Sequence, residues 1–227
     1  MSKRTGKLIV VDGTDGSGKA TQVERLTSEL IRFGFDPVSV SFPRYGKTSS
    51  ELIEQYLNGQ LTFSNAYGPA LLYAYDRLAA KAEIQNYLSQ GKIVVIDRYV
   101  MSNCAYQGSK IDDPDAQLRF IKWVFNLEYD LLALPKPDLN IILYVEPSVS
   151  KRLLAARSKA AVIKNDIHEA SDSHQQRAAQ LYKYLARIAP NSYLIDCMAG
   201  GQLQSVDKIA AQVWNKVYRQ VLNNPIL

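Results

Sequence analysis

The sequence predicts an α/β fold in which a five-stranded parallel sheet is flanked by helices. Two observations support this prediction. Apolar, β-rich runs alternate with segments of helical periodicity along the whole chain. The apolar runs are also continuous rather than interrupted at every second residue, which is typical of strands buried on both faces of a parallel sheet. The helices that connect such strands would cover the two faces.

The predicted strands are Leu8–Asp12, Pro37–Phe42, Lys92–Asp97, Leu139–Val145 and Ser192–Asp196. A glycine-rich loop follows the first strand, and the helix after it ends at Gly34. The other predicted helices are Ser49–Leu57, Ala66–Ser89, Pro114–Leu131, Ser148–Arg157, Ser173–Ile188 and Leu203–Val221. We expect one domain over residues 1–227, in which a polar, basic segment at about residues 157–169 forms a short lid.

Composition favours a globular, cytoplasmic protein. Of the 227 residues, 47% are hydrophobic, which is enough for a sizeable core. No apolar run reaches the roughly 18–20 residues of a membrane-spanning helix, and the start of the chain lacks the layout of a signal peptide. Cys104 and Cys197 have no paired spacing, so neither a disulfide framework nor a cysteine-rich metal site is predicted. We expect no membrane partner.

The net charge of +5 is compatible with an anionic ligand. Basic residues are spread along the chain, and they are densest from Lys151 to Lys164. That stretch suits a small polyanion such as ATP at least as well as a nucleic-acid backbone, unless it is only a solvated helix face. We therefore expect no nucleic-acid partner.

The stretch DGTDGSGKATQ, between the first strand and the first helix, predicts a phosphate-binding loop. Its glycines allow the backbone to bring N–H groups close to phosphate oxygens, and the helix that follows attracts anions through its N-terminus. The spacing differs from the dinucleotide fingerprint G-x-G-x-x-G, which argues against a dehydrogenase. The expected ATP-binding residues are Gly13, Thr14, Asp15, Gly16, Ser17, Gly18, Lys19, Ala20 and Thr21.

The loop departs from the strict G-x-x-x-x-G-K-[ST] pattern at its last position. Ala20 replaces the hydroxyl that normally helps to hold Mg²⁺, and Thr21 is rotated about 100° around the helix from that position. We therefore expect Mg²⁺ to be held mainly by phosphates and water, with support from Asp97.

Two further segments follow predicted strands. DRYVMSNCAYQG (Asp97–Gly108) follows the third strand, and FPRYG (Phe42–Gly46) follows the second. In an open parallel sheet, ligands bind at the carboxyl edge where such segments lie. Asp97 could steer Mg²⁺ through water, and Arg98 offers a fork of donors for phosphate. A structural Asp–Arg pair at a strand end is the alternative for DRY, and an ordinary loop is the alternative for FPRYG.

Together these segments resemble the thymidylate kinase family. FPRYG, LLYAYDR, DRYVMSNCAYQG and LPKPD occur in that family's order behind a GxDGxGK loop, and the likeness runs from about Lys7 to Leu185. The resemblance implies the P-loop fold of nucleoside monophosphate kinases with a five-stranded parallel sheet. It also implies a homodimer that uses ATP and Mg²⁺ to convert dTMP to dTDP, the precursor of dTTP.

The resemblance assigns roles at the sugar and phosphate end of the substrate. Asp15 matches a carboxylate that contacts the 3′-hydroxyl and a nearby arginine, and Tyr106 could crowd a 2′-hydroxyl. Arg98, and less surely Arg44 and Tyr45, would bind the monophosphate.

At the base end, Tyr73 matches an aromatic ring that stacks on thymine, unless it only packs in the core. Arg77 could donate to thymine O4 and so reject cytosine, or it could form a surface ion pair. Asn103 can pair with the base edge. Phe42 and Pro43 would form an apolar wall near the thymine methyl group.

The expected catalytic residues are Lys19, Arg98, Arg157 and Asp15. Because Gly16 follows Asp15, the sequence is similar to members of the family that supply a catalytic arginine from the lid. Arg157 is the best candidate there, with Lys159 and Lys164 as weaker point charges. Asp166 and Glu169 match carboxylates that order arginines after the lid, or they cap a helix.

Two other functions stay open. A deoxynucleoside kinase would phosphorylate a 5′-hydroxyl and would need a carboxylate base beside it. A nucleotide-binding regulatory protein without turnover would explain Ala20 and the scarcity of arginine in the lid.

Overall fold

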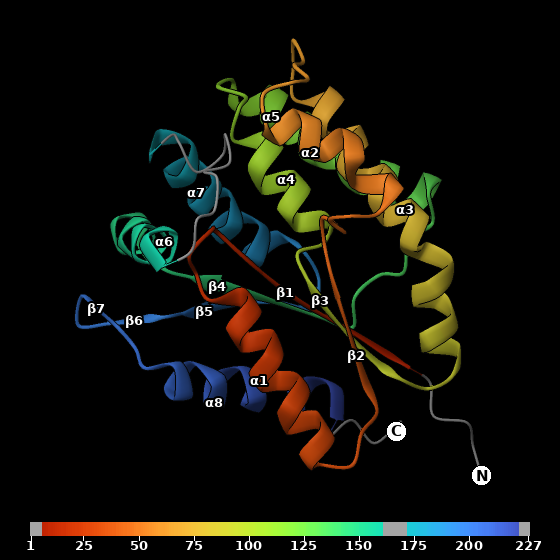
Figure 1. Cartoon of the computed structure of the whole chain (residues 1–227), viewed down its shortest axis with the longest axis vertical. Coiled ribbons are helices and arrows are strands. Elements are labelled where there is room, and N and C mark those ends of the chain that lie inside the picture. The colour runs from red at the N-terminus through yellow and green to blue at the C-terminus, as the bar shows by residue number, and fades with distance from the viewer. Residues whose placement is uncertain (1–5, 161–171, 223–227) are drawn as a thin grey trace.

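The computed structural model describes residues 6–160 and 172–222. Its centre is a five-stranded parallel sheet with the strand order β2-β3-β1-β4-β5 (Figure 1). The strands are β1 (Lys7–Gly13), β2 (Pro37–Ser41), β3 (Ile93–Asp97), β4 (Leu139–Tyr144) and β5 (Ser192–Asp196). A two-stranded hairpin, β6 (Met198–Ala199) and β7 (Gln202–Leu203), follows β5. The predicted fold class and all five predicted strands are confirmed.

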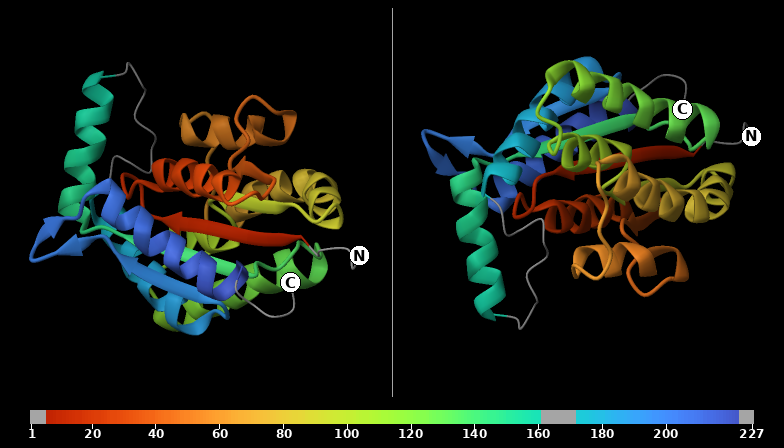
Figure 2. Two further views of the ribbon diagram at one scale, coloured as in Figure 1. Left: turned by 90° about the horizontal axis from the view of Figure 1, so that it is seen from below. Right: turned by 90° about the horizontal axis from the view of Figure 1, so that it is seen from above.

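Helices cover both faces of the sheet (Figures 1 and 2). The helices on one face are α3 (Tyr67–Ser89), α4 (Val100–Gly108), α5 (Pro114–Phe125) and α7 (Asp172–Ile188). The other face is covered by α1 (Lys19–Arg32) and α8 (Val206–Val217). The central strand β1 shows why both faces are apolar: Leu8 and Val10 pack in the first core, whereas Ile9 and Val11 pack in the second. Continuous apolar strands therefore bury both of their faces, as the sequence predicts.

Two helices lie outside these layers. The short helix α2 (Glu51–Leu57) follows the turn η1 (Thr48–Ser50) and packs on α3 through Ile53 and its neighbours. The helix α6 (Pro147–Ala160) extends away from the body of the molecule, as Figure 2 shows. Within the described residues, none of the helices combines the length and the apolar character that a membrane crossing requires.

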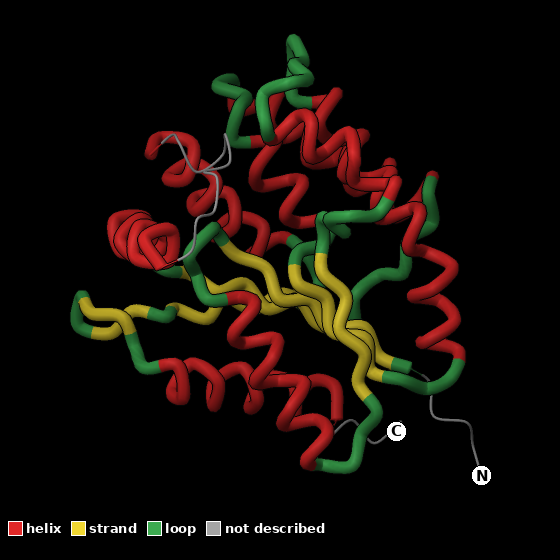
Figure 3. The backbone as a smooth tube through the Cα atoms, in the orientation of Figure 1, coloured by secondary structure: helices red, strands yellow, loops and turns green. Residues whose placement is uncertain are grey.

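The helices and strands of the structure, coloured in Figure 3, differ from the predicted elements at several places. The α4 helix has no counterpart among the predicted helix ranges, and the β6–β7 hairpin was not predicted. The predicted helix Pro114–Leu131 is a regular α-helix only to Phe125 and then widens into the π-helical turn η2 (Asn126–Leu131). The last predicted helix likewise divides into α8 and the π-helical η3 (Tyr218–Leu222).

Parallel register brings the carboxyl ends of three strands together. Asp97, the last residue of β3, pairs with Val11 of β1 on one side and with Ser41 of β2 on the other. The glycine loop and the segments FPRYG and DRYVMSNCAYQG therefore start from adjacent points on one edge of the sheet.

Candidate active site

The glycine loop connects β1 to α1, and its backbone requires glycine. Gly13, Gly16 and Gly18 all have positive φ angles, of 146°, 75° and 86°. A Cβ atom at Gly16 would lie 2.7 Å from the carbonyl oxygen of Ser150, so a side chain there would also collide with α6. The loop thus turns at the carboxyl end of β1 and leads directly into the N-terminus of α1, as a phosphate-binding loop does.

Lys19 is the first residue of α1 and is buried, with 6% of its surface exposed. Its Nζ donates a hydrogen bond of 2.8 Å to the carbonyl oxygen of Thr14. Burial and, to a smaller extent, the nearby positive charge of Arg98 together lower the pKa of Lys19 to about 8. The ammonium group therefore lies in a place that an anion would stabilise.

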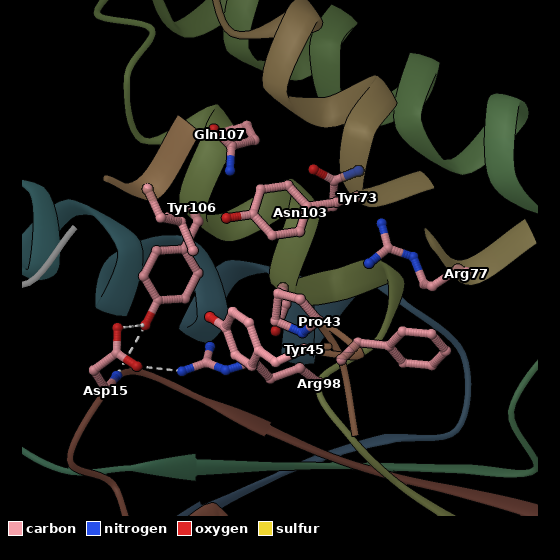
Figure 4. Close-up of a pocket in the computed structure, with 12 residues that line it drawn as sticks. Asp15, Pro43, Tyr45, Tyr73, Arg77, Arg98, Asn103, Tyr106 and Gln107 are labelled. Atoms are coloured by element: carbon pink, nitrogen blue, oxygen red, sulfur yellow. Dashed lines mark hydrogen bonds and ion pairs between the residues drawn. The ribbon is translucent and has the colours of Figure 1, made fainter. Parts of the chain in front are cut away.

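Asp15, Arg98 and Tyr106 connect the glycine loop to a pocket (Figure 4). Nη2 of Arg98 forms an ion pair with Oδ1 of Asp15. The hydroxyl of Tyr106 donates to Asp15 Oδ2 over 2.6 Å and accepts from the Asp15 backbone N–H over 2.9 Å. The Arg98 guanidinium also lies 5.2 Å from the centre of the Tyr106 ring. Asp15 is therefore held in one cluster with two residues that lie more than 80 positions later in the chain.

The backbone of Arg98 is unusual. Its φ of 64° lies in the left-handed region, which is uncommon for a residue with a side chain. Its N–H donates to the carbonyl of Val11 over 3.1 Å, which fixes the turn at the end of β3. Strained residues of this kind concentrate at functional sites.

The pocket opens between the loop, α3 and α4. Nine of the ten residues predicted to bind substrate line it. The full lining is Asp15, Phe42, Pro43, Tyr45, Leu57, Tyr73, Arg77, Arg98, Ser102, Asn103, Tyr106 and Gln107. Tyr73 also packs against the small cluster on α2, so core packing and pocket lining are both true of it.

Arg44 is the predicted residue that does not line this pocket. Its backbone N–H donates to Oδ2 of Asp76 over 2.8 Å, and its guanidinium lies near Asp76 and Glu83. Asp76 is buried and also accepts a hydrogen bond from Ser49. These contacts anchor the FPRYG loop to α3, and a role for Arg44 in phosphate binding stays a prediction.

The far end of the pocket contains a buried ion pair. Arg77 and Glu128 are exposed by 2% and 0%, so the alternative of a surface ion pair for Arg77 is wrong. Two of the Arg77 nitrogens donate to Glu128, over 2.5 Å and 2.7 Å. Asn103 donates from Nδ2 to the same carboxylate over 2.9 Å and to the carbonyl of Ala70 over 3.0 Å. Its Oδ1 is buried and has no hydrogen-bond partner among the described residues.

The residues near Ala20 permit only a weak contact to a cation. Oδ1 of Asp97 is buried without a hydrogen-bond partner in the described part of the chain. Asp97 and Ala20 line the same hollow between α1 and β2, and Thr21 is not part of its lining. No group of three or more His, Cys, Asp or Glu residues gathers as a metal site within residues 6–160 and 172–222. One carboxylate oxygen fits a cation whose other ligands come from phosphate and water.

The lid lies mostly outside the described residues. Helix α6 includes the backbone of Arg157, and nothing is described of its side chain. Lys164, Asp166 and Glu169 lie outside the described residues.

Two charged residues that shape this site escaped the sequence prediction, as did the pocket-lining residues Leu57, Ser102 and Gln107. Asp76 directly precedes Arg77 in LLYAYDR, within the predicted helix Ala66–Ser89. A carboxylate next to a predicted site residue could have been identified from the sequence. Glu128 gave no signal, because its partner Arg77 is 51 residues away in the chain.

A parallel sheet with a phosphate-binding loop after its central strand, beside a pocket that places an arginine and a carboxylate at the loop, defines a P-loop kinase. The family model described as "Thymidylate kinase" matches residues 11–207, and the chain belongs to this family. It is a thymidylate kinase enzyme that phosphorylates dTMP in an ATP-dependent reaction.

Relatives and a solved structure agree with this assignment. The thymidylate kinase of Mycobacterium tuberculosis is 33% identical over 79% of this chain and 85% of its own. The probable thymidylate kinase of Staphylothermus marinus is 34% identical over 97% of this chain and 95% of its own. The solved structure of Candida albicans thymidylate kinase is 26% identical, with a TM-score of 0.74 over 95% of this chain and 92% of that chain.

Proposed function

We propose that the pocket in Figure 4 binds dTMP and that residues 13–21 bind the phosphates of ATP. The observation that carries this proposal is the cluster of Asp15, Arg98 and Tyr106, which connects the loop to the pocket. An acceptor phosphate held at Arg98 would lie beside the loop that holds the donor. Alignment of two phosphates and neutralisation of their charge are the main requirements of phosphoryl transfer.

At the base end, the supporting evidence is a pair of polar groups on an apolar wall. Asn103 offers an acceptor oxygen without a partner among the described residues, which suits the N3–H of thymine. Arg77 has donors on a guanidinium that Glu128 holds in place, and one of them would bind O4. Tyr73 would stack on the ring, and Phe42 and Pro43 would lie near the methyl group.

At the sugar end, Asp15 would accept from the 3′-hydroxyl. Burial raises the pKa of Tyr106, so its hydroxyl stays protonated and continues to donate to Asp15. The Tyr106 ring would occupy the space that a 2′-hydroxyl needs. Arg98, which Asp15 orients, would bind the 5′-phosphate with its remaining donors.

At the loop, Lys19 and the N–H groups of residues 13–21 would stabilise the negative charge that the transferred group carries. We propose Asp97 as a ligand of Mg²⁺ through water, on the evidence of its buried Oδ1. When it is bound, Mg²⁺ neutralises charge on the donor phosphates. We propose that residues of about 157–169 form a lid within a single domain and that Arg157 supplies a further cation from it.

A homodimer is also proposed. Leu71, Tyr75 and Leu78 are exposed by 49%, 56% and 36%, and their spacing places them on one face of α3. Because the opposite face of α3 packs in the core, this helix is apolar on two sides and suits a second copy of the chain.

A cytoplasmic location stays a prediction. The two cysteines are buried and form no disulfide, which is compatible with a reducing compartment.

The residue roles are tested by steady-state kinetics with ATP, Mg²⁺ and dTMP, dUMP, dCMP or thymidine as the acceptor. We expect dTMP to have the highest kcat/KM, and Asn103→Ala to lower the ratio of kcat/KM for dTMP to that for dCMP at least tenfold. Thymidine as the preferred acceptor would indicate a deoxynucleoside kinase. Calorimetric binding of ATP and dTMP without product would indicate a regulatory protein.

A further inference from the structure

Glu128 is an acidic residue that is fully buried and has no place in the lining of the pocket. It lies on the π-helical turn η2, which follows α5 directly. Burying a carboxylate is costly unless it is paired and hydrogen-bonded. Glu128 is paired with Arg77 and also accepts from Asn103, and both of these residues line the base end of the pocket. One carboxylate behind the pocket wall therefore touches both polar residues of that wall.

The contact with Glu128 fixes which way the Asn103 amide faces. An amide can present either its oxygen or its NH₂ group, and the hydrogen-bond network decides between them. Both neighbours of the Nδ2 group, Ala70 O and Glu128 Oε1, can only accept. Reversing the amide would place its oxygen against two acceptor oxygens. Nδ2 must therefore face these neighbours, which leaves Oδ1 as the group that a bound base can meet.

An acceptor in this position discriminates between pyrimidines. Thymine and uracil carry a proton on N3, whereas N3 of cytosine is an acceptor. A buried oxygen that meets N3–H gains a hydrogen bond, but one that meets the cytosine N3 is left unpaired beside a second acceptor. The same logic applies at Arg77, because its donors suit a carbonyl at position 4 and oppose the amino group of cytosine.

We propose that Glu128 is a positioning residue that sets the preference for an imide base. It holds the Arg77 guanidinium as a donor and fixes the Asn103 amide as an acceptor. This inference rests on the proposed function, in which those two residues read the base. Glu128 touches neither substrate nor the reacting phosphates, so its effect belongs to substrate selection and not to the transfer step.

Glu128→Gln tests the inference because glutamine has the same shape but only one acceptor oxygen. If that oxygen faces Asn103, the new NH₂ group meets Nε–H of Arg77. If the oxygen faces Nε–H, the NH₂ group meets the amino groups of Arg77 and Asn103, and the Asn103 amide reverses to accept from it. In either orientation a donor opposes a donor, and one of the two base contacts is lost.

Kinetics with dTMP and dCMP at saturating ATP and Mg²⁺ measure the effect. We expect Glu128→Gln to lower the ratio of kcat/KM for dTMP to that for dCMP about tenfold or more. The loss should appear mainly as a higher KM for dTMP, with kcat changed by less than about threefold. Glu29→Gln is the matched control, because the Glu29 side chain is partly exposed and bonds only to Arg32 among the contacts described; it should keep both constants.

Glu128→Asp is the second variant, for the case that Glu128→Gln does not fold. It keeps the charge opposite Arg77, but its side chain is one methylene shorter and cannot reach both partners. We expect it to lower the same ratio about fivefold or more. Wild-type selectivity in a folded Glu128 variant would overturn the inference, and so would equal losses for both substrates or a loss confined to kcat.

Asn103→Ala separates the two levels of the argument. If it lowers selectivity while the Glu128 variants do not, the inference fails and the proposed base contact stands. If Asn103→Ala also leaves selectivity unchanged, the proposed base contact itself fails.

Discussion

Replacing Lys19 with methionine should have opposite effects on activity and on stability. Under the proposed function, Lys19 supplies the charge that the phosphate-binding loop needs, so the variant should lose nearly all turnover. The ligand-free protein, however, holds this ammonium group in a buried place beside the positive charge of Arg98. Methionine fills a similar volume without a charge. We therefore expect Lys19→Met to be inactive but more stable than the wild type at neutral pH.

The magnitude follows from the pKa of Lys19. Burial, with a smaller effect of Arg98, lowers it from 10.5 to about 8. A change of one in the pKa corresponds to about 1.4 kcal/mol, so the charge on Lys19 costs the folded state roughly 3 kcal/mol. The variant also loses the hydrogen bond from Nζ to Thr14 O, which is worth about 1 kcal/mol. The net gain in the free energy of unfolding at pH 7 should then be about 2 kcal/mol.

The pH dependence has a definite sign. Between pH 8 and 10.5 the unfolded chain binds a proton at Lys19 that the folded protein does not, so wild-type stability gains from rising pH there. Below about pH 8 the cost is fully present. Burial raises the pKa of Cys104 and Cys197, which opposes this gain above pH 9, but the cysteines act equally in both proteins. The difference between variant and wild type should therefore shrink from pH 7 to 10.

Urea denaturation of the ligand-free proteins at pH 7, 8, 9 and 10 measures this difference. Lys122→Met is the matched control, because Lys122 is exposed on α5, and its stability should follow the wild type at every pH. A Lys19→Met protein less stable than the wild type at pH 7 would refute the reasoning. So would a stability difference that does not change with pH.

Three further predictions concern the phosphates and the metal. Arg98→Ala should lower kcat/KM for dTMP about 10²–10³-fold, since it removes a donor and leaves Asp15 without the cation of its ion pair; near-normal turnover would contradict its role. Arg157→Ala should lower kcat at least about 100-fold with KM unchanged, and an unchanged rate would place the catalytic cation elsewhere. Ala20→Ser restores the missing hydroxyl, so a Mg²⁺ titration of activity should reach half-maximum at about a threefold lower concentration. The same midpoint as the wild type would mean that position 20 does not face the metal.

The fold could be predicted in nearly full detail because its signals are local. Each strand is a continuous apolar run, and the structure places all five within a residue or two of the predicted bounds. The α4 helix is missing from the predicted helices, because all of its residues are buried and it shows no polar face. The π-helical turn η2 continues a helical pattern, so the sequence alone gives no reason to separate it from α5.

The candidate site could be predicted only as far as motifs extend. The glycine loop and DRYVMSNCAYQG identify residues at strand ends, and parallel register brings such residues together. Glu128 lies on no motif and is placed by the packing of η2 against α3 and α4. Glu128 contacts pocket-lining residues without lining the pocket itself, so its place in the site depends on tertiary contacts. A local sequence pattern contains no information about such contacts.

The buried polar groups of this site follow one rule. The pKa of Lys19 is lowered from its ordinary value of 10.5 to about 8. Asp97 Oδ1 and Asn103 Oδ1 are buried and have no hydrogen-bond partner among the described residues. Under the proposed function, a donor phosphate would lie beside Lys19, a hydrated cation beside Asp97 and an imide base beside Asn103. Each group costs the ligand-free fold some stability, because Lys19 is a buried charge and the two oxygens lose their hydration without gaining a hydrogen bond. The same groups need no rearrangement when the ligands bind, so the stability given up in the free protein becomes affinity and selectivity in the complex.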